Sequence, residues 1–202
     1  MIVATPLDLA PLQPDSWSVL WAIWNKYSGD LVKTSTNLTD SEASIGNRSI
    51  WRGLDIYRAS LARTAWTAPY YDISRELPQL LRDIKNNEMF DILHRVRIIQ
   101  SNMDIPAHSD DRRASWYLRC MIHNTDVNSQ WYFTANDSDE RKYLHMPKDT
   151  NWFAYNDGAC KHGSDYHPEH AKLLVQFYGE YKHEPQVIAR SINKYKEYTI
   201  TL

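Results

Sequence analysis

The chain has 202 residues, of which 43% are hydrophobic and 24% are charged, and its formal net charge is -2 at pH 7. That length fits a single domain with a sizeable core. The charge balance lacks the basic footprint of a nucleic-acid-binding protein, no apolar run reaches the length of a membrane span, and the first residues do not resemble a signal peptide. Two cysteines do not make a secreted disulfide framework, so we expect a cytoplasmic protein that binds neither nucleic acid nor membrane.

The beginning of the chain predicts an extended lead-in followed by a helix. Three prolines fall within residues 1–14 and favour extended backbone. Asp15 or Ser16 can cap the helix, because their side chains accept hydrogen bonds from its first N–H groups. An apolar stripe at helical spacing supports this helix and consists of Trp17, Leu20, Trp21, Trp24 and Tyr27. We interpret the stripe as core or dimer contact, and the polar residues 33–48 as a loop.

The remainder of the chain predicts one more helix and many strands. Residues 51–58 alternate well enough for a strand, and Pro78 opens a helix that ends at Asn86. Polar turns separate the strands predicted after it, at residues 93–100, 106–110, 116–123, 130–134, 143–146, 151–155, 159–162 and 172–178. The tail at residues 194–198 predicts one more strand or a cover for the site. These elements together predict an α+β, mainly β protein built around a sheet sandwich or a small barrel.

His108-Ser109-Asp110, with His162 far downstream, is the most informative pattern of the chain. Residues two apart on an extended segment share a face, so His108 and Asp110 can reach one metal ion. Two histidines and one carboxylate occupy one face of an octahedron and leave three positions open, as in non-haem Fe(II) oxygenases. The same ligands also suit Zn(II). A cupin-like isomerase or hydrolase, or an inactive jelly-roll binding module, therefore stays an alternative.

Further residues of the C-terminal half have an ordered spacing around this pattern. In chain order they are Arg97-Ile98-Ile99, Ile105-Pro106, Leu118-Arg119, His145-Met146, Trp152-Phe153, Asp157 five residues before His162, and Lys172-Leu173-Leu174. In this order the segment from Arg95 to Tyr178 resembles the aspartyl/asparaginyl β-hydroxylase family of Fe(II)/2-oxoglutarate dioxygenases. Within that family it is most similar to the bacterial cis-hydroxylases of free L-proline.

The resemblance implies a role for each matched residue. His108, Asp110 and His162 would be the iron ligands. Lys172 stands where the family usually has an arginine that pairs with the distal carboxylate of 2-oxoglutarate, and lysine offers a point charge there instead of a bidentate fork. Arg119 matches the arginine of the family's Arg-x-His element, whose histidine is replaced by Met121 in this chain. Asp157 would support the His162 segment through a turn with Gly158.

The resemblance also implies the fold and the reaction. The fold would be a double-stranded β-helix (jelly-roll, cupin-like) core with N-terminal helices packed on one face. One oxygenase domain would cover residues 1–202, with a mixed helical part at 1–90, the core at 91–182 and a C-terminal strand or tail at 183–202. The enzyme would use Fe(II), 2-oxoglutarate and O2, with ascorbate in support. It would hydroxylate an amino acid or an amino-acid residue of a peptide, of the proline type or the Asp/Asn type with proline as the leading candidate, and release succinate and CO2.

Several residues near the pattern are candidates for substrate contact. Arg112 and Arg113 could meet a substrate carboxylate, and the alternative is a solvated pair beside Asp110 and Asp111. Trp116 is a further candidate contact. Aromatic walls that restrict water would come from Trp116, Trp131 or Trp152. We interpret Cys120 and Cys160 as small core residues on strands near the site.

Overall fold

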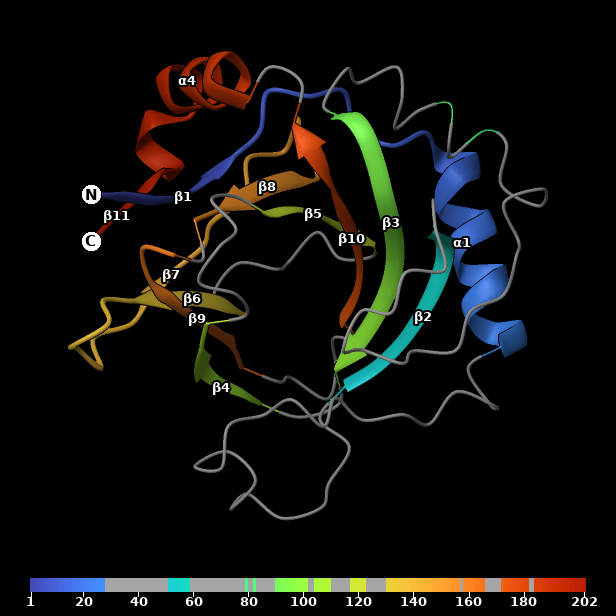
Figure 1. The fold of residues 1–202 in the computed structure, drawn as a ribbon, viewed down its shortest axis with the longest axis horizontal. Coiled ribbons are helices and arrows are strands. Elements are labelled where there is room, and N and C mark those ends of the chain that lie inside the picture. Colours follow the sequence, from blue (N-terminus) through green and yellow to red (C-terminus); the bar gives the residue numbers. More distant parts are fainter. Residues whose placement is uncertain are drawn as a thin grey trace.

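The chain forms two antiparallel β-sheets with helices at the outside of the larger one (Figure 1). This computed structural model describes residues 1–27, 51–58, 79, 82, 90–101, 104–109, 117–122, 130–156, 158–165, 172–181 and 184–202. Within these ranges none of the helices has the length and apolar character needed to cross a membrane. The predicted mainly β fold is confirmed.

The large sheet has seven strands and the small sheet has four within the described ranges. Across the large sheet the order is β11 (Ile200–Thr201), β1 (Ile2–Pro6), β8 (Trp152–Tyr155), β5 (Tyr117–Ile122), β10 (Lys172–Tyr181), β3 (Phe90–Ser101) and β2 (Trp51–Arg58). Across the small sheet the order is β4 (Ile105–His108), β9 (Lys161–Ser164), β6 (Trp131–Thr134) and β7 (Lys142–Tyr143). Most neighbouring strands are distant in sequence, and among the described strands only β2 with β3 and β6 with β7 are consecutive in the chain.

Two apolar cores lie on opposite faces of the large sheet, because side chains alternate along each strand. Ile98 belongs to one core and its neighbour Ile99 to the other. The helix-side core joins the large sheet to helices α1 (Pro14–Tyr27) and α4 (Glu184–Lys194). The inter-sheet core joins it to the small sheet and consists of Val3, Ala4, Ile99, Ile105, Trp131, Phe133, Leu144, Phe153, Tyr155, Cys160, Leu174 and Ile200. We call the face of each sheet that borders this second core its inner face.

Helix α1 confirms the predicted N-terminal helix and packs against the helix-side core (Figure 1). Pro14 begins it, at a position where a missing N–H costs nothing. Leu20 and Trp24 of the predicted stripe are buried, together with Ile23 beside them, and its other three residues are partly buried. Its Trp17 lies at the margin of the core and donates an indole hydrogen bond of 3.1 Å to the Leu12 carbonyl.

The predicted strands are confirmed with shifts at their ends. Strand β2 has the predicted bounds, whereas β3 and β10 extend beyond theirs. Strand β4 ends at His108 instead of residue 110, and β9 occupies Lys161–Ser164 instead of residues 159–162. Of the helix predicted from Pro78, Gln79 and Arg82 are described and are helical. The loop predicted at residues 33–48 lies outside the described residues.

The C-terminal strand or tail predicted for residues 183–202 contains a strand near its end, β11 at Ile200–Thr201. Residues 194–198 form no strand: helix α4 ends at Lys194, and a 3-10 turn follows at η1 (Lys196–Tyr198). The reason is a buried face at helical spacing, formed by Val187, Ile188 and Ser191, with Tyr195 buried directly after the helix. The predicted extended lead-in is confirmed, since its first part forms strand β1, which pairs with β8 and β11.

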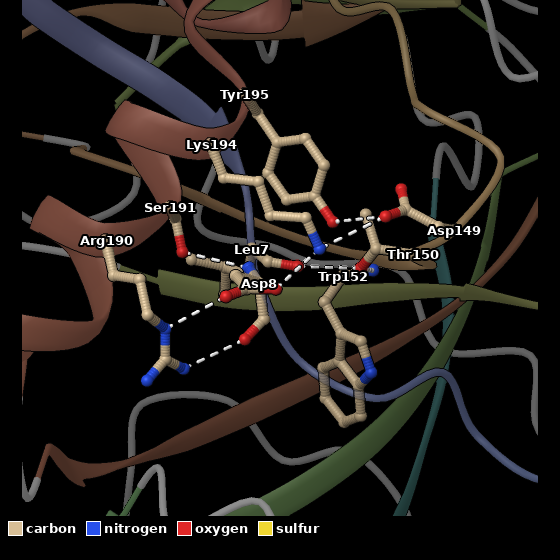
Figure 2. A network of polar contacts seen from close by, with 9 residues as sticks. All are labelled: Leu7, Asp8, Asp149, Thr150, Trp152, Arg190, Ser191, Lys194 and Tyr195. Atoms are coloured by element: carbon tan, nitrogen blue, oxygen red, sulfur yellow. Dashed lines mark hydrogen bonds and ion pairs between the residues drawn. The ribbon is translucent and has the colours of Figure 1, made fainter.

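A polar network holds α4 against the turn after β1 (Figure 2). Asp8 receives ion pairs from Arg190 at 3.0 Å and Lys194 at 2.7 Å, and Lys194 also reaches Asp149 at 3.1 Å. Burial opposes ionisation of Asp149, but hydrogen bonds from Lys194 and Tyr195 outweigh it and lower the pKa of that carboxyl. The Ser191 hydroxyl, fully buried, accepts a hydrogen bond of 2.9 Å from the Asp8 backbone N–H.

We expect Ser191→Ala to lower the free energy of unfolding by about 1–2 kcal/mol, because the Asp8 N–H would lose its partner beneath the helix. Urea denaturation followed by circular dichroism measures this change. Asn193→Ala, at an exposed position of the same helix, is the matched control and should change the stability by less than about 0.5 kcal/mol. Equal losses in both variants would contradict a specific role for the Ser191 hydroxyl.

Candidate metal centre

His108 and His162 stand opposite each other on neighbouring strands. Strands β4 and β9 pair in antiparallel register with His108 and His162 as Cα partners. Their ring centroids are 4.5 Å apart with an interplanar angle of 46°. His162 also pairs with Phe133, which lies in the inter-sheet core. Paired residues of adjacent strands share a face, so both histidines belong to the inner face of the small sheet.

The His108 ring is oriented by its own strand. Its Nδ1 atom lies 2.8 Å from the Pro106 carbonyl oxygen. A carbonyl only accepts, so Nδ1 carries the hydrogen and donates it, and in the neutral ring Nε2 then holds the lone pair. A ring nitrogen bonded to a backbone carbonyl while the other nitrogen binds the metal is the usual arrangement of ligating histidines. The geometry of His108 thus fits a ligand that binds through Nε2.

His162 is fully buried among aromatic side chains. The Tyr155 hydroxyl oxygen lies 3.3 Å from its Nε2 atom, and the two ring centroids are 4.5 Å apart. Trp131 stacks at 6.2 Å with an interplanar angle of 20°. Of the three tryptophans expected to form walls, Trp131 therefore borders the site. Trp152 does not, because it faces the helix-side core and its indole N–H donates to the Ala10 carbonyl at 2.8 Å.

A tyrosine on the opposite face holds β4 and β9 in this register. The Tyr132 hydroxyl crosses β9 at Gly163 and donates a hydrogen bond of 3.1 Å to the Ile105 carbonyl of β4. Burial raises the pKa of Tyr132, and Arg141, whose guanidinium lies 4.2 Å from the ring centroid, opposes that rise only in part. The hydroxyl therefore keeps its proton for the bond. Tyr132 of β6 thus contacts both strands that carry the histidines.

A second contact joins the same strands beyond the histidine pair. The Ser109 hydroxyl donates to the Cys160 carbonyl at 3.3 Å. Ser109 is the middle residue of His108-Ser109-Asp110, and Cys160 precedes β9 directly. Cys160 is buried in the inter-sheet core, as expected of a small core residue, and its thiol donates to the Asn156 carbonyl at 3.3 Å. The backbone that leads to Asp110 is therefore kept beside β9.

The other predicted site residues are placed only in part. Five lie outside the described residues, namely Asp110, Arg112, Arg113, Trp116 and Asp157. Within the described ranges no group of three potential metal ligands occurs, and the predicted third ligand, Asp110, falls outside them. Lys172 begins β10 and Arg119 lies in β5, where the backbone pairs it with Gln176. The structure thus brings His108 and His162 together and leaves the third ligand as a prediction.

Sequence reasoning missed three polar residues of the inner faces. Tyr155 contacts His162 directly. Arg97 is only 3% exposed, and it alternates on β3 with Ile98, so it shares the inner face with Ile99. Ser164, fully buried, pairs with Trp131, and its hydroxyl has no hydrogen-bond partner among the described residues. Alternation within each strand was the available signal, but it does not tell which face is inside.

The two imidazoles fit a single metal ion. With metal–nitrogen bonds of about 2.1 Å, two imidazoles at right angles on one ion have ring centroids about 4.6 Å apart. The observed separation of 4.5 Å agrees with this value. The Nε2 lone pair of His108 and the buried polar hydroxyl of Ser164 also suit a site that takes a cation and polar ligands.

Comparison with known proteins supports the fold. A prolyl hydroxylase from Trichoplax adhaerens, solved with a hypoxia inducible factor oxygen degradation domain peptide fragment, matches 92% of this chain and 86% of its own at a TM-score of 0.52 and 11% identity. AviO1 from Streptomyces viridochromogenes Tue57 matches 89% of this chain and 90% of its own at a TM-score of 0.50 and 10% identity. A Pseudomonas putida prolyl-4-hydroxylase matches 89% of this chain and 94% of its own at a TM-score of 0.48 and 10% identity. No protein-family model and no curated protein matches the chain.

At such low identity the likeness to the Trichoplax adhaerens and Streptomyces structures shows a shared fold. It extends over about nine-tenths of this chain, so it includes both sheets. A shared fold does not define the reaction, which depends on the residues of the site.

We expect Gly163→Ala to destabilise the protein by about 1–3 kcal/mol. A Cβ atom there would lie 2.3 Å from the Tyr132 hydroxyl oxygen and 2.5 Å from the Ile105 carbonyl oxygen, so β4 and β9 would have to move apart. Thermal and urea unfolding measure the loss. Lys161→Ala, on the same strand but partly exposed, is the control. Wild-type stability in Gly163→Ala would show that β4 tolerates the displacement.

Proposed function

We propose that this protein is an Fe(II)- and 2-oxoglutarate-dependent dioxygenase that hydroxylates an amino acid or an amino-acid residue of a peptide. The observation that carries the proposal is the pairing of His108 with His162, with the rings 4.5 Å apart on the inner face of the small sheet. Two histidines placed on adjacent strands and one carboxylate are the ligands that such oxygenases use.

Asp110 is proposed as the third ligand. It follows Ser109, whose hydroxyl bond to the Cys160 carbonyl keeps this end of the motif next to β9. His108, His162 and Asp110 together would hold the iron on one side only. The three remaining coordination positions would then be available to the two donor atoms of 2-oxoglutarate and to O2.

Lys172 and Arg119 are proposed to bind the carboxylates of 2-oxoglutarate. Alternate residues of a strand share a face, so position 172 falls in the same row of β10 as Leu174, which lies in the inter-sheet core. Position 119 pairs with Phe153 of β8, which lies in the same core. A cation on the inner face would orient an anionic cosubstrate through a charge-assisted hydrogen bond.

The strand order supports a double-stranded β-helix as the finer description of the fold. From β3 onward the chain alternates between the sheets: β3, β5, β8 and β10 lie in the large sheet, and β4, β6, β7 and β9 lie in the small one. We propose that residues 1–202 form one such domain. Its branch would be the aspartyl/asparaginyl β-hydroxylase family, close to the proline cis-hydroxylases, as the order of sequence motifs indicates.

The chain's own residues have defined tasks in this reaction. His108 presents Nε2 because its Nδ1 is bonded to Pro106, and His162 is fixed between Tyr155 and Trp131. The buried aromatic rings keep water away from the reacting substrate. A ferrous ion bound here would supply oxidative decarboxylation of 2-oxoglutarate to succinate and CO2, coupled to insertion of one oxygen atom into a substrate C–H bond. Ascorbate would keep the iron reduced.

The substrate class is proposed as proline, either free or in a peptide. The Trichoplax adhaerens neighbour is a prolyl hydroxylase solved with a peptide fragment, which supports peptidyl proline. The sequence resemblance to the L-proline cis-hydroxylases supports the free amino acid. Mass spectrometry of products from a panel of free amino acids and a panel of peptides separates the two, since hydroxylation adds one oxygen atom to the substrate.

His108→Ala and His162→Ala are each expected to abolish succinate release in an aerobic assay with Fe(II), ascorbate and 2-oxoglutarate. Each should also lose the thermal stabilisation that Fe(II) or Mn(II) gives the wild type, because a ligand is missing. His145→Ala, at an exposed position, is the control and should behave like the wild type. Normal turnover in either ligand variant would overturn the proposal, as would a wild type unaffected by chelation of its metal.

Lys172→Met is expected to raise the KM for 2-oxoglutarate by roughly one to two orders of magnitude, since a charge-assisted hydrogen bond is worth about 1.5–3 kcal/mol. Metal binding should be unchanged. Lys148→Met removes an exposed lysine and is the matched control. An unchanged KM in Lys172→Met would assign the carboxylate to another residue, whereas a wild type that consumes no 2-oxoglutarate would favour a metalloenzyme of other chemistry.

A further inference from the structure

Tyr155 places a hydroxyl oxygen beside the candidate metal centre, in addition to the three proposed ligands His108, His162 and Asp110. It comes from β8 in the middle of the large sheet, whereas His162 comes from the small sheet. Its side chain is fully buried and lies in the inter-sheet core. Its hydroxyl oxygen points at His162 Nε2, the atom equivalent to the one that His108 presents.

The separation of the two atoms matches two ligands of one ion. At 3.3 Å the Tyr155 oxygen is farther from Nε2 than in a strong hydrogen bond, for which about 2.8 Å is usual with a hydroxyl donor. A metal bound to nitrogen at about 2.1 Å and to oxygen at about 2.0 Å, with an angle of about 90–110° between the bonds, separates its donors by about 2.9–3.4 Å. The separation of Nε2 and the phenol oxygen therefore falls in the range expected for two donors bound to one ion.

We infer that the Tyr155 oxygen is an additional ligand of the iron before cosubstrate and substrate bind. The inference rests on the proposed function, since it places a further donor at the same ion. The metal takes the Nε2 lone pair and thereby removes an acceptor from the hydroxyl. The phenol oxygen then binds the metal, and its proton leaves to solvent. Tyrosine oxygen is an established iron ligand in proteins.

Iron(III) provides the test, because a tyrosine oxygen bound to iron(III) produces a charge-transfer band in the visible region. The protein is loaded with Fe(II) without oxygen, bound iron is quantified, and one equivalent of ferricyanide oxidises Fe(II) to Fe(III). We expect the band in the wild type and its loss in Tyr155→Phe. That variant keeps the buried ring, so it should fold, and it should bind Mn(II) roughly tenfold more weakly.

Tyr143→Phe is the matched control. It removes a hydroxyl from the same small sheet, where Tyr143 bonds Asp165 at 2.7 Å and stacks edge-on against Tyr132 outside the inter-sheet core. It should retain the band and the metal affinity. A band that persists in Tyr155→Phe, or iron bound by the wild type without any band, overturns the role of Tyr155 and leaves the dioxygenase proposal standing. A wild type that binds no iron overturns both.

Discussion

The pairing of β4 with β9 is the contact on which the site depends. Strand β4 has four residues and lies at an edge of the small sheet, with β9 as its neighbour. A slip of one residue would turn His108 to the other face, away from His162. The Tyr132 bond to Ile105 and the Ser109 bond to Cys160 secure the two ends of this short strand. Register is therefore specified by side chains as well as by the backbone ladder.

Local sequence patterns predicted many of the helices and strands, but they did not predict which distant strands pair with each other. Periodicity was enough for α1 and β2, and His108-Ser109-Asp110 indicated a candidate metal centre only together with His162 and the ordered residues around it. The position of His162 opposite His108 depends on which strands meet, and no alternation within one strand contains that information. Tyr155 was missed for a related reason: β8 is buried on both faces, so Phe153 and Ala154 are equally apolar and the inner side cannot be chosen. Helix α4 was missed because its apolar positions are few.

The large sheet separates two environments of different character. Among the described residues, its outer face packs against the helices through an apolar core that includes Val175 and Phe177. Its inner face mixes such residues with Arg97 and Tyr155, and the small sheet adds His162 and Ser164. Burial of polar groups costs free energy unless they are paired or bind something. On the inner face this cost falls where the chemistry would take place, while the helix-side core supplies stability.

Pro106 has an effect on the molecule's behaviour towards other chains. It lies in the edge strand β4, and proline has no N–H to offer a neighbouring strand. The opposite edge of the small sheet, β7, is only two residues long. An incoming β-strand would therefore find little to hydrogen-bond at either border, which protects this sheet from edge-to-edge aggregation. The same proline that orients His108 through its carbonyl thus helps to keep the protein from polymerising.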